Sequence, residues 1–272
     1  MDFFVKNWTD YRPEQLVQLF RERFKNKSSL STEISRLKTL LKKSEHPPCE
    51  EYLAGLKLER KEYSELNKIA DKKRQKAAMD VTVIDNAPDI VKRALSFLKS
   101  GIPELTFIAL LVLTGCRPVE LLRVAEFENP TGKHGKRHKY FAAQTAFAKR
   151  RHDAESRDRP FLAPFKDVKA GLDLVRKTFS CEGLNNTGIN NRWCAFFNNV
   201  LRNQFPELIT QRMCRRFFAL YSYESFGKMK YNGKDETHGS LIAYSSHVLG
   251  HDSGLGSGIC YQSLKINAQP LK

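Results

Sequence analysis

Hydrophobic positions recur at helical spacing through the first 45 residues and alternate with basic and polar ones. Ser31, Thr32 and Glu33 together resemble the start of a second helix. Pro47 and Pro48 end it, because proline cannot continue a helix. Two amphipathic helices are therefore predicted, with apolar faces formed by Leu16, Leu19, Phe20, Phe24, Ile34, Leu37, Leu40 and Leu41.

A long polar helix is predicted for residues 50–78, where an intermittent apolar stripe carries Leu53, Leu56, Leu66 and Ile69. Its acidic residues lie three or four positions from lysines, so part of its charge is a solvated helix face. A basic cluster near its end has few such partners, and either contacts phosphates or extends the solvated face. The cluster consists of Lys72, Lys73, Arg74 and Lys76.

The pattern then becomes more apolar. A helix is predicted to begin at residues 85–89, and residues 105–113 form an uninterrupted apolar run of core-helix length that ends at Gly115. A basic, turn-rich loop over 129–139 and a strand over 140–147 follow. Further helices are predicted at 166–178, 190–204, 208–226 and 239–249. The expected fold is mainly α with one small β-sheet (α+β), divided into a helical region 1–79 and a second domain 80–272.

Composition supports a folded protein with an anionic partner. The chain has 272 residues, of which 41% are hydrophobic, and its formal net charge is +16. Such a charge favours binding to a polyanion through phosphate neutralisation, although a merely soluble basic surface is the alternative. No apolar run approaches the ~18–20 residues of a membrane span, and no signal-peptide cleavage site follows Met1. A cytoplasmic protein without a membrane partner is expected.

Six cysteines are scattered without Cys-x-x-Cys spacing, which argues against a zinc site or a disulfide framework. Free buried thiols are expected. His247 and His251 lie four residues apart, but no glutamate occupies position 248 and Gly250 interrupts the helix. We therefore expect no metal site.

Arginines are the first candidates for binding a phosphate. Arg117 follows a buried helix and a glycine, and Glu120 is placed to orient its guanidinium; a structural salt bridge is the alternative. Arg212 and Arg215 are three residues apart and share a helix face, whereas Arg216 points elsewhere unless it pairs with Arg212. Because buried arginines without carboxylates are costly, an anion is the expected partner.

Three other residue types complete a phosphoryl-transfer site. Lys149, at the predicted strand end, can protonate a leaving oxygen, with Arg150 and Arg151 as competitors. His251 can donate to a phosphate oxygen or help to deprotonate a tyrosine. Tyr261 follows a glycine-containing tether that suits a mobile nucleophile.

These residues in this order resemble the tyrosine recombinase/type IB topoisomerase superfamily and, more narrowly, the telomere resolvases (protelomerases). The resemblance covers about residues 55–272. It is carried by Thr114-Gly115-Cys116-Arg117-Pro118-Val119-Glu120, by Gln144 to Lys149, and by Leu249-Gly250-His251-Asp252 with Tyr261-Gln262-Ser263-Leu264. Two spacings, from Gln144 to Lys149 and from His251 to Tyr261, are wider than is usual in relatives.

The resemblance implies a catalytic set of Arg117, Lys149, Arg215, His251 and Tyr261, with Arg212 at a position that varies among relatives. It also implies cleavage of duplex DNA at an inverted repeat by a dimer, through a 3′-phosphotyrosine, without metal or cofactor. Hairpin telomere formation is the expected outcome, on bacterial, phage or plasmid-associated DNA. A site-specific integrase, a topoisomerase and an inactive DNA-binding protein remain alternatives. The expected DNA contacts are Lys72, Lys73, Arg74, Lys76, Lys136, Arg137, Arg150 and Arg151.

Overall fold

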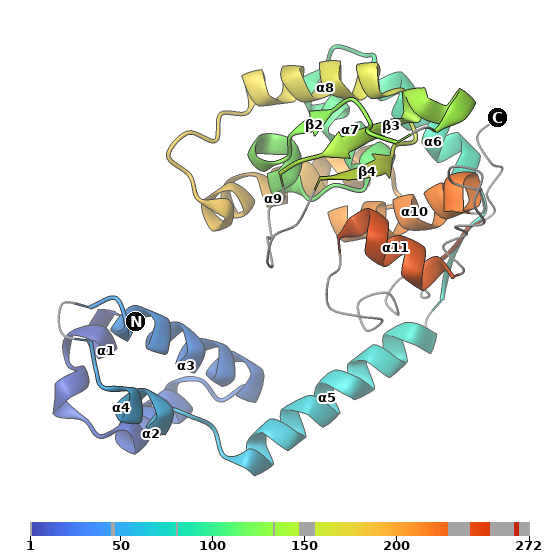
Figure 1. Ribbon diagram of the computed structural model, residues 1–272. Coiled ribbons are helices and arrows are strands. Elements are labelled where there is room, and N and C mark those ends of the chain that lie inside the picture. The colour runs from blue at the N-terminus through green and yellow to red at the C-terminus, as the bar shows by residue number, and fades with distance from the viewer. Residues whose placement is uncertain are drawn as a thin grey trace. The chain divides into compact units, whose positions relative to one another are not determined.

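The computed structural model describes residues 2–44, 47–79, 81–132, 134–146, 156–227, 240–250 and 264–266. The chain divides into two compact units, Met1–Lys76 and Ala77–Lys272. Each unit has its own cluster of buried hydrophobic side chains. The predicted α+β class is confirmed, since helices dominate and the strands are few and short (Figure 1).

The first unit is helical and surrounds a small apolar core. Its core contains Leu16, Phe20 and Leu37, which are fully buried, and the Phe4 ring lies 4.4 Å from that of Phe20. The predicted second helix begins at Lys27 rather than near Ser31. The elements are α1 (Asp2–Lys6), a 3-10 turn η1 (Trp8–Asp10), α2 (Pro13–Arg23), α3 (Lys27–Leu41), α4 (Glu50–Gly55) and α5 (Arg60–Met79).

The prediction of one continuous helix over residues 50–78 is wrong, because α4 ends at Gly55 and α5 begins at Arg60. Leu56 and Leu58 are both buried. Residues two positions apart lie on opposite sides of a continuous helix, so the break allows both side chains to reach the core.

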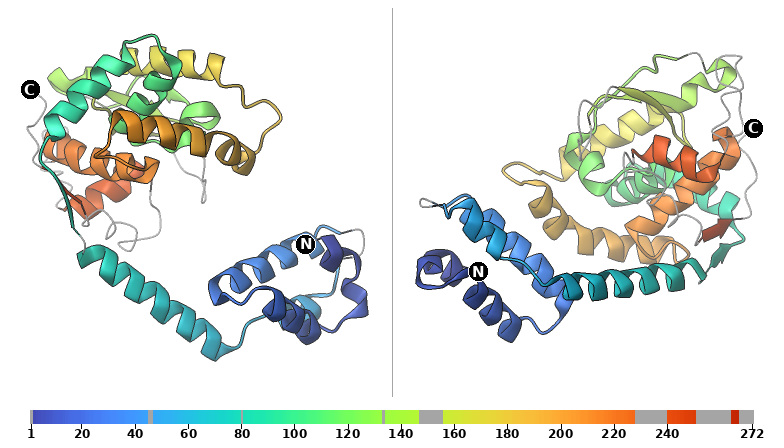
Figure 2. Two further views of the ribbon diagram at one scale, coloured as in Figure 1. Left: turned by 180° about the vertical axis from the view of Figure 1, so that it is seen from behind. Right: turned by 60° about the horizontal axis from the view of Figure 1, so that its bottom comes forward.

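The second unit is built around α7 (Pro103–Thr114), whose residues from Thr106 onward are all buried. This confirms the predicted core helix. α7 packs against α6 (Ala87–Leu98), α8 (Phe165–Thr178), α9 (Asn186–Gln204) and α10 (Gln211–Ser222) (Figure 1). The unit also contains the π-helical turns η2 (Glu120–Val124) and η4 (Tyr223–Gly227), the 3-10 helix η3 (Gly135–Tyr140) and α11 (Leu241–Leu249). α10 and α11, orange and red-orange in Figure 2, contact each other.

The described residues form two small sheets where one was predicted. β2 (Phe127–Glu128), β3 (Phe141–Gln144) and β4 (Arg157–Pro160) form an antiparallel sheet in which Phe141 pairs with Pro160 and Gln144 with Arg157. β1 (Thr82–Ile84) and β5 (Leu264–Ile266), dark red in Figure 2, form a parallel pair. The predicted strand over 140–147 is shorter where it is described, and the predicted loop over 129–139 contains η3.

None of the helices in the described ranges is long and apolar enough to cross a membrane. Those ranges also contain no cluster of three or more histidine, cysteine or acidic residues that could hold a metal ion. Five free cysteines are described, of which Cys116 and Cys214 are buried, whereas Cys49 is exposed. The prediction of buried thiols is therefore wrong for Cys49.

Candidate active site

The end of α7 determines where Arg117 lies. Gly115 adopts the left-handed conformation (φ +61°), and a Cβ atom at this position would lie 2.2 Å from Cδ1 of Phe218 on α10. Only glycine allows both the conformation and this close approach. The Thr114 hydroxyl donates to the Leu110 carbonyl (2.6 Å) and accepts from the Cys116 amide (3.2 Å). The chain therefore leaves the buried helix in a defined turn.

Glu120 orients Arg117, in agreement with their spacing in the sequence. The Arg117 backbone amide donates to Glu120 Oε2 (2.7 Å), and Arg117 Nη1 donates to Glu120 Oε1 (2.8 Å). The Glu120 side chain is buried, whereas that of Arg117 remains 27% exposed. Glu120 thus fixes the Arg117 guanidinium from the buried side, and the Arg117 side chain remains partly accessible to solvent.

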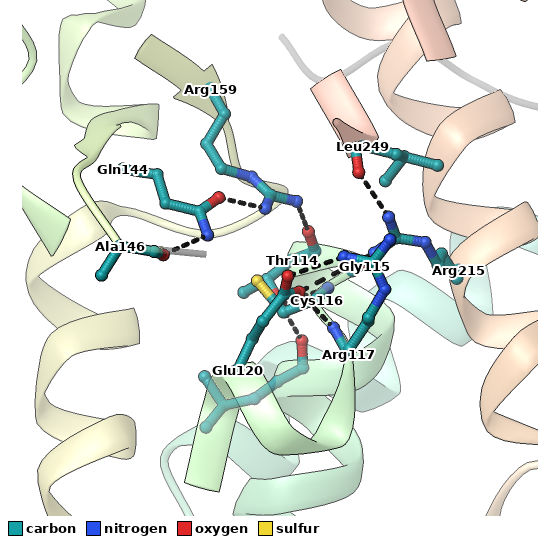
Figure 3. Close-up of polar contacts among 11 residues, drawn as sticks. Thr114, Gly115, Cys116, Arg117, Glu120, Gln144, Ala146, Arg159, Arg215 and Leu249 are labelled. Carbon is teal, nitrogen blue, oxygen red and sulfur yellow. Dashed lines mark hydrogen bonds and ion pairs between the residues drawn. The ribbon is translucent and has the colours of Figure 1, made fainter. Parts of the chain in front are cut away.

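Arg215 on α10 joins the ends of two other helices (Figure 3). Its Nη1 atom donates to the Gly115 carbonyl after α7, and its Nη2 atom to the Leu249 carbonyl at the end of α11, both at 2.5 Å. Each of these helices ends at a left-handed glycine, Gly115 or Gly250. Arg215 thereby satisfies helix-terminal carbonyls and brings the Arg117 turn close to the residue that precedes Gly250.

Glu120 dominates the electrostatics of the cluster formed by Arg117, Glu120 and Arg215. Burial alone would raise the pKa of Glu120, but Arg117 and Arg215, a backbone hydrogen bond and Arg159 together hold that pKa below its usual range. Glu120 Oε2 also lies 4.0 Å from Arg215 Nη1. The expectation that Arg215 lacks a carboxylate is therefore wrong, although Glu120 also faces Arg117.

A pocket of about 510 Å³ opens beside this cluster. It adjoins the N-terminus of α10, where Thr210 caps the helix by accepting from the Met213 amide. Arg216 lines the pocket together with Arg212 and Arg215, so of the two predicted arrangements the one in which it lies on the side of Arg212 fits the structure. The helix dipole and the arginines favour an anion here. The lining residues are Cys116, Arg117, Pro118, Asn190, Cys194, Asn198, Thr210, Gln211, Arg212, Arg215 and Arg216.

Several predicted site residues lie outside the described residues, namely Lys149, Arg150, Arg151, His251 and Tyr261. His251 directly follows Gly250 in the sequence, and Tyr261 precedes β5 by three residues. The structure therefore brings together Arg117, Arg212 and Arg215 from the predicted set.

The predicted DNA contacts differ in exposure. Lys72 on α5 and Lys136 on η3 are exposed. Lys73, Arg74 and Lys76 are helical in their backbone. Arg137 instead donates through Nη1 to the Ser225 carbonyl and lies 5.7 Å from the Phe226 ring centroid. Its guanidinium connects η3 to η4, which argues against a primary role in DNA contact.

Sequence reasoning missed a buried cation next to the cluster. Arg159 on β4 is 1% exposed and donates to Gln144 Oε1 (2.8 Å) and to the Thr114 carbonyl (2.5 Å). An arginine in the polar segment Arg157–Pro160 carries no local signal of burial, because its position depends on pairing with β3.

Comparison with known families finds that the telomere resolvase ResT/TelK catalytic domain matches residues 80–262. Among solved structures, selenomethionine protelomerase TelA covalently complexed with substrate DNA is similar, with a TM-score of 0.76 and 17% identity over 93% of this chain and 82% of that chain. Protelomerase TelK complexed with substrate DNA has a TM-score of 0.60 and 19% identity over 82% and 46%. At these identities the likeness concerns the fold. No curated protein matches the chain.

Proposed function

The chain belongs to the telomere resolvases with a ResT/TelK catalytic domain, and from this premise we propose that it cleaves and rejoins duplex DNA through Tyr261. The Tyr261 oxygen attacks a backbone phosphorus, and the bond from phosphorus to the 5′ oxygen breaks. The product is a 3′-phosphotyrosine and a free 5′ hydroxyl. Because the phosphotyrosine retains the energy of the broken phosphodiester, a later hydroxyl attack can reseal the strand.

Each remaining predicted residue has a distinct role in this step. Arg117 and Arg215 bind the non-bridging phosphate oxygens and stabilise the charge that develops on them. Lys149 gives a proton to the leaving 5′ oxygen, and His251 donates a hydrogen bond or assists removal of the tyrosine proton. Arg212, which lines the same pocket, holds the phosphate or a neighbouring one.

The observation that carries the proposal is the convergence of Arg117 and Arg215 on Glu120, beside an arginine-lined pocket. Two guanidinium groups face one carboxylate, and Arg212 and Arg216 line the same pocket, so the site is rich in donors that suit a phosphate.

Hairpin formation follows when the strand that attacks is the folded-back partner of the cleaved one. Each 5′ hydroxyl then attacks the phosphotyrosine across the inverted repeat, releases Tyr261 and closes an end. We assign residues 1–79 to DNA clamping and residues 80–272 to catalysis. A homodimer on an inverted repeat supplies two such sites related by a two-fold axis.

The test is incubation of the protein with a linear inverted-repeat substrate from its own replicon, with a Tyr261→Phe variant as control. Strands that double in length on a denaturing gel and snap back after heating are expected only with the unsubstituted protein. A covalent protein–DNA adduct without hairpins would point to an integrase or topoisomerase. DNA binding without any cleavage of this substrate would indicate a DNA-binding protein that lacks the chemistry.

A further inference from the structure

Arg159 is a buried cation that the proposed chemistry does not use. Its described hydrogen-bond acceptors, Gln144 Oε1 and the Thr114 carbonyl, are both neutral oxygens. Its Nε atom is buried and has no hydrogen-bond partner among the described residues. Burying a guanidinium that is not hydrogen-bonded to a carboxylate costs folding free energy. The segments that its two hydrogen bonds connect indicate the structural role of Arg159.

The first bond fixes the turn that carries Arg117. Arg159 holds the carbonyl of Thr114, and Arg215 holds the carbonyl of the next residue, Gly115 (Figure 3). Two successive carbonyls at the end of α7 are thus held by arginines from different elements, β4 and α10. The position of Arg117, two residues later, depends on both.

The second bond leads to the end of β3. Gln144 is fully buried, accepts from Arg159 through Oε1, and donates through Nε2 to the Ala146 carbonyl (2.9 Å) (Figure 3). Ala146 precedes Lys149 by three residues in the sequence. One guanidinium–amide pair therefore connects the Arg117 turn with the chain that leads to the proposed proton donor.

We propose that Arg159 and Gln144 are positioning residues that hold the Arg117 turn and the strand end before Lys149 in one fixed relation. The proposal rests on the proposed function, because it acts through the phosphate-binding arginine and the proton donor. A phosphoryl-transfer site is sensitive to such placement, since a shift of about 1 Å can cost about 100-fold in rate. Support from buried side chains on rigid strands keeps reacting groups in place.

The sharpest variant is Gln144→Glu. One carboxylate oxygen still accepts from Arg159, and the new charge neutralises the guanidinium. The other oxygen now faces the Ala146 carbonyl, so the hydrogen bond that holds the strand end is replaced by a repulsion. Gln144→Glu thus keeps both hydrogen bonds of Arg159 and removes only the one from Gln144 to the Ala146 carbonyl. Arg159→Met removes both hydrogen bonds of Arg159, to Gln144 and to the Thr114 carbonyl.

Two substrates distinguish their effects. The first, the oxygen substrate, has the normal 5′ bridging oxygen at the scissile phosphate. In the second, the sulfur substrate, this oxygen is replaced by sulfur, which leaves as a thiolate and needs no proton donor. We expect Gln144→Glu to cleave the oxygen substrate about 10-fold or more slowly, but the sulfur substrate within about 3-fold of the unsubstituted protein. Arg159→Met should be slow on both substrates, because it also releases the Thr114 carbonyl.

Arg93→Met is the control for losing an arginine that holds a backbone carbonyl, although Arg93 also lies 3.6 Å from Glu207. Arg93 also holds a backbone carbonyl, that of Gln204 at 2.7 Å, and lies 5.4 Å from the Phe205 ring centroid. It belongs to α6 and has no assigned role in cleavage. Its loss should lower the thermal stability without changing the cleavage rate on either substrate.

The outcomes are separable. Equal slowing of Gln144→Glu on both substrates, or cleavage by Arg159→Met at the rate of Arg93→Met, would overturn the positioning proposal. If Arg159→Met does not fold, Gln144→Glu still decides, since it retains a charged pair at these two positions. Failure of the unsubstituted protein to cleave, or cleavage by Tyr261→Phe, would instead reject the proposed function and the positioning proposal with it.

Discussion

At Glu120 a single carboxylate accepts hydrogen bonds from the side chain and the backbone of Arg117 and lies 4.0 Å from Arg215. Glu120→Gln should therefore lower the free energy of unfolding by about 3 kcal/mol, because it leaves two guanidinium groups without their shared counter-charge. Chemical denaturation at neutral pH measures this loss. Glu182→Gln, in an exposed turn, should change stability by less than about 0.5 kcal/mol.

Glu120→Gln should also change how the stability of the protein depends on pH. Because the pKa of Glu120 is held below its ordinary value of 4.5, its ionised form stabilises the fold above that pH. This contribution is lost as the pH falls through the lowered pKa, and Glu120→Gln has no such group to titrate. The stability difference between the two proteins should therefore be constant above about pH 6 and shrink below 4.5. A difference that grows on acidification would contradict the assigned direction.

Single residues also show what the sequence allows one to predict. The pairing of Arg117 with Glu120 was predictable, because both lie within one helical turn after a glycine that ends a helix. The burial of Arg159 was not, since its partners lie 15 and 45 residues away in the sequence. The sharing of Glu120 with Arg215 depends on the packing of α10 against α7 in the same way.

Among the elements, we expect the junction between α7 and α10 to be sensitive to substitution. Gly115→Ala places a methyl group 2.2 Å from the Phe218 ring and forces alanine into a left-handed conformation. The expected loss in unfolding free energy is about 2–5 kcal/mol, the sum of backbone strain and overpacking. Thermal or denaturant unfolding measures it.

Gly101→Ala is the matched control, because Gly101 is also left-handed (φ +71°) but a methyl group placed there would have no atom of the described residues within 4 Å. It should cost only the conformational part, about 1–2 kcal/mol. Equal losses at the two positions would mean that contact with Phe218 contributes nothing, and that the ring moves aside.

Long, uniformly patterned elements were predictable, and short or tertiary-dependent ones were not. α7 is apolar on every side and ends at a glycine, so its limits follow from local sequence. β1 and β5 have three residues each and pair across most of the chain, from Thr82 to Leu264. Strands this short carry no periodicity, and the second sheet therefore had no sequence signal.

At the scale of the whole molecule, the net charge of +16 leads us to expect that binding to DNA depends strongly on salt concentration. Each phosphate neutralised should contribute about 0.9 to the slope of log affinity against log salt concentration. Lys72, exposed on α5, is a candidate for one such contact. Lys72→Gln should weaken binding and reduce the slope by about 1, whatever the sequence of the duplex.

Lys99→Gln separates this contact from a general effect of charge. Lys99 lies 3.8 Å from Asp167, so its charge is already partly compensated within the protein. Both variants lower the net charge by one, and a purely long-range effect would change their slopes equally. A reduced slope for Lys72→Gln alone, measured by titration of a duplex at several salt concentrations, would identify a local phosphate contact on α5. Equal slopes would leave the DNA-clamping role of residues 1–79 without support from this helix.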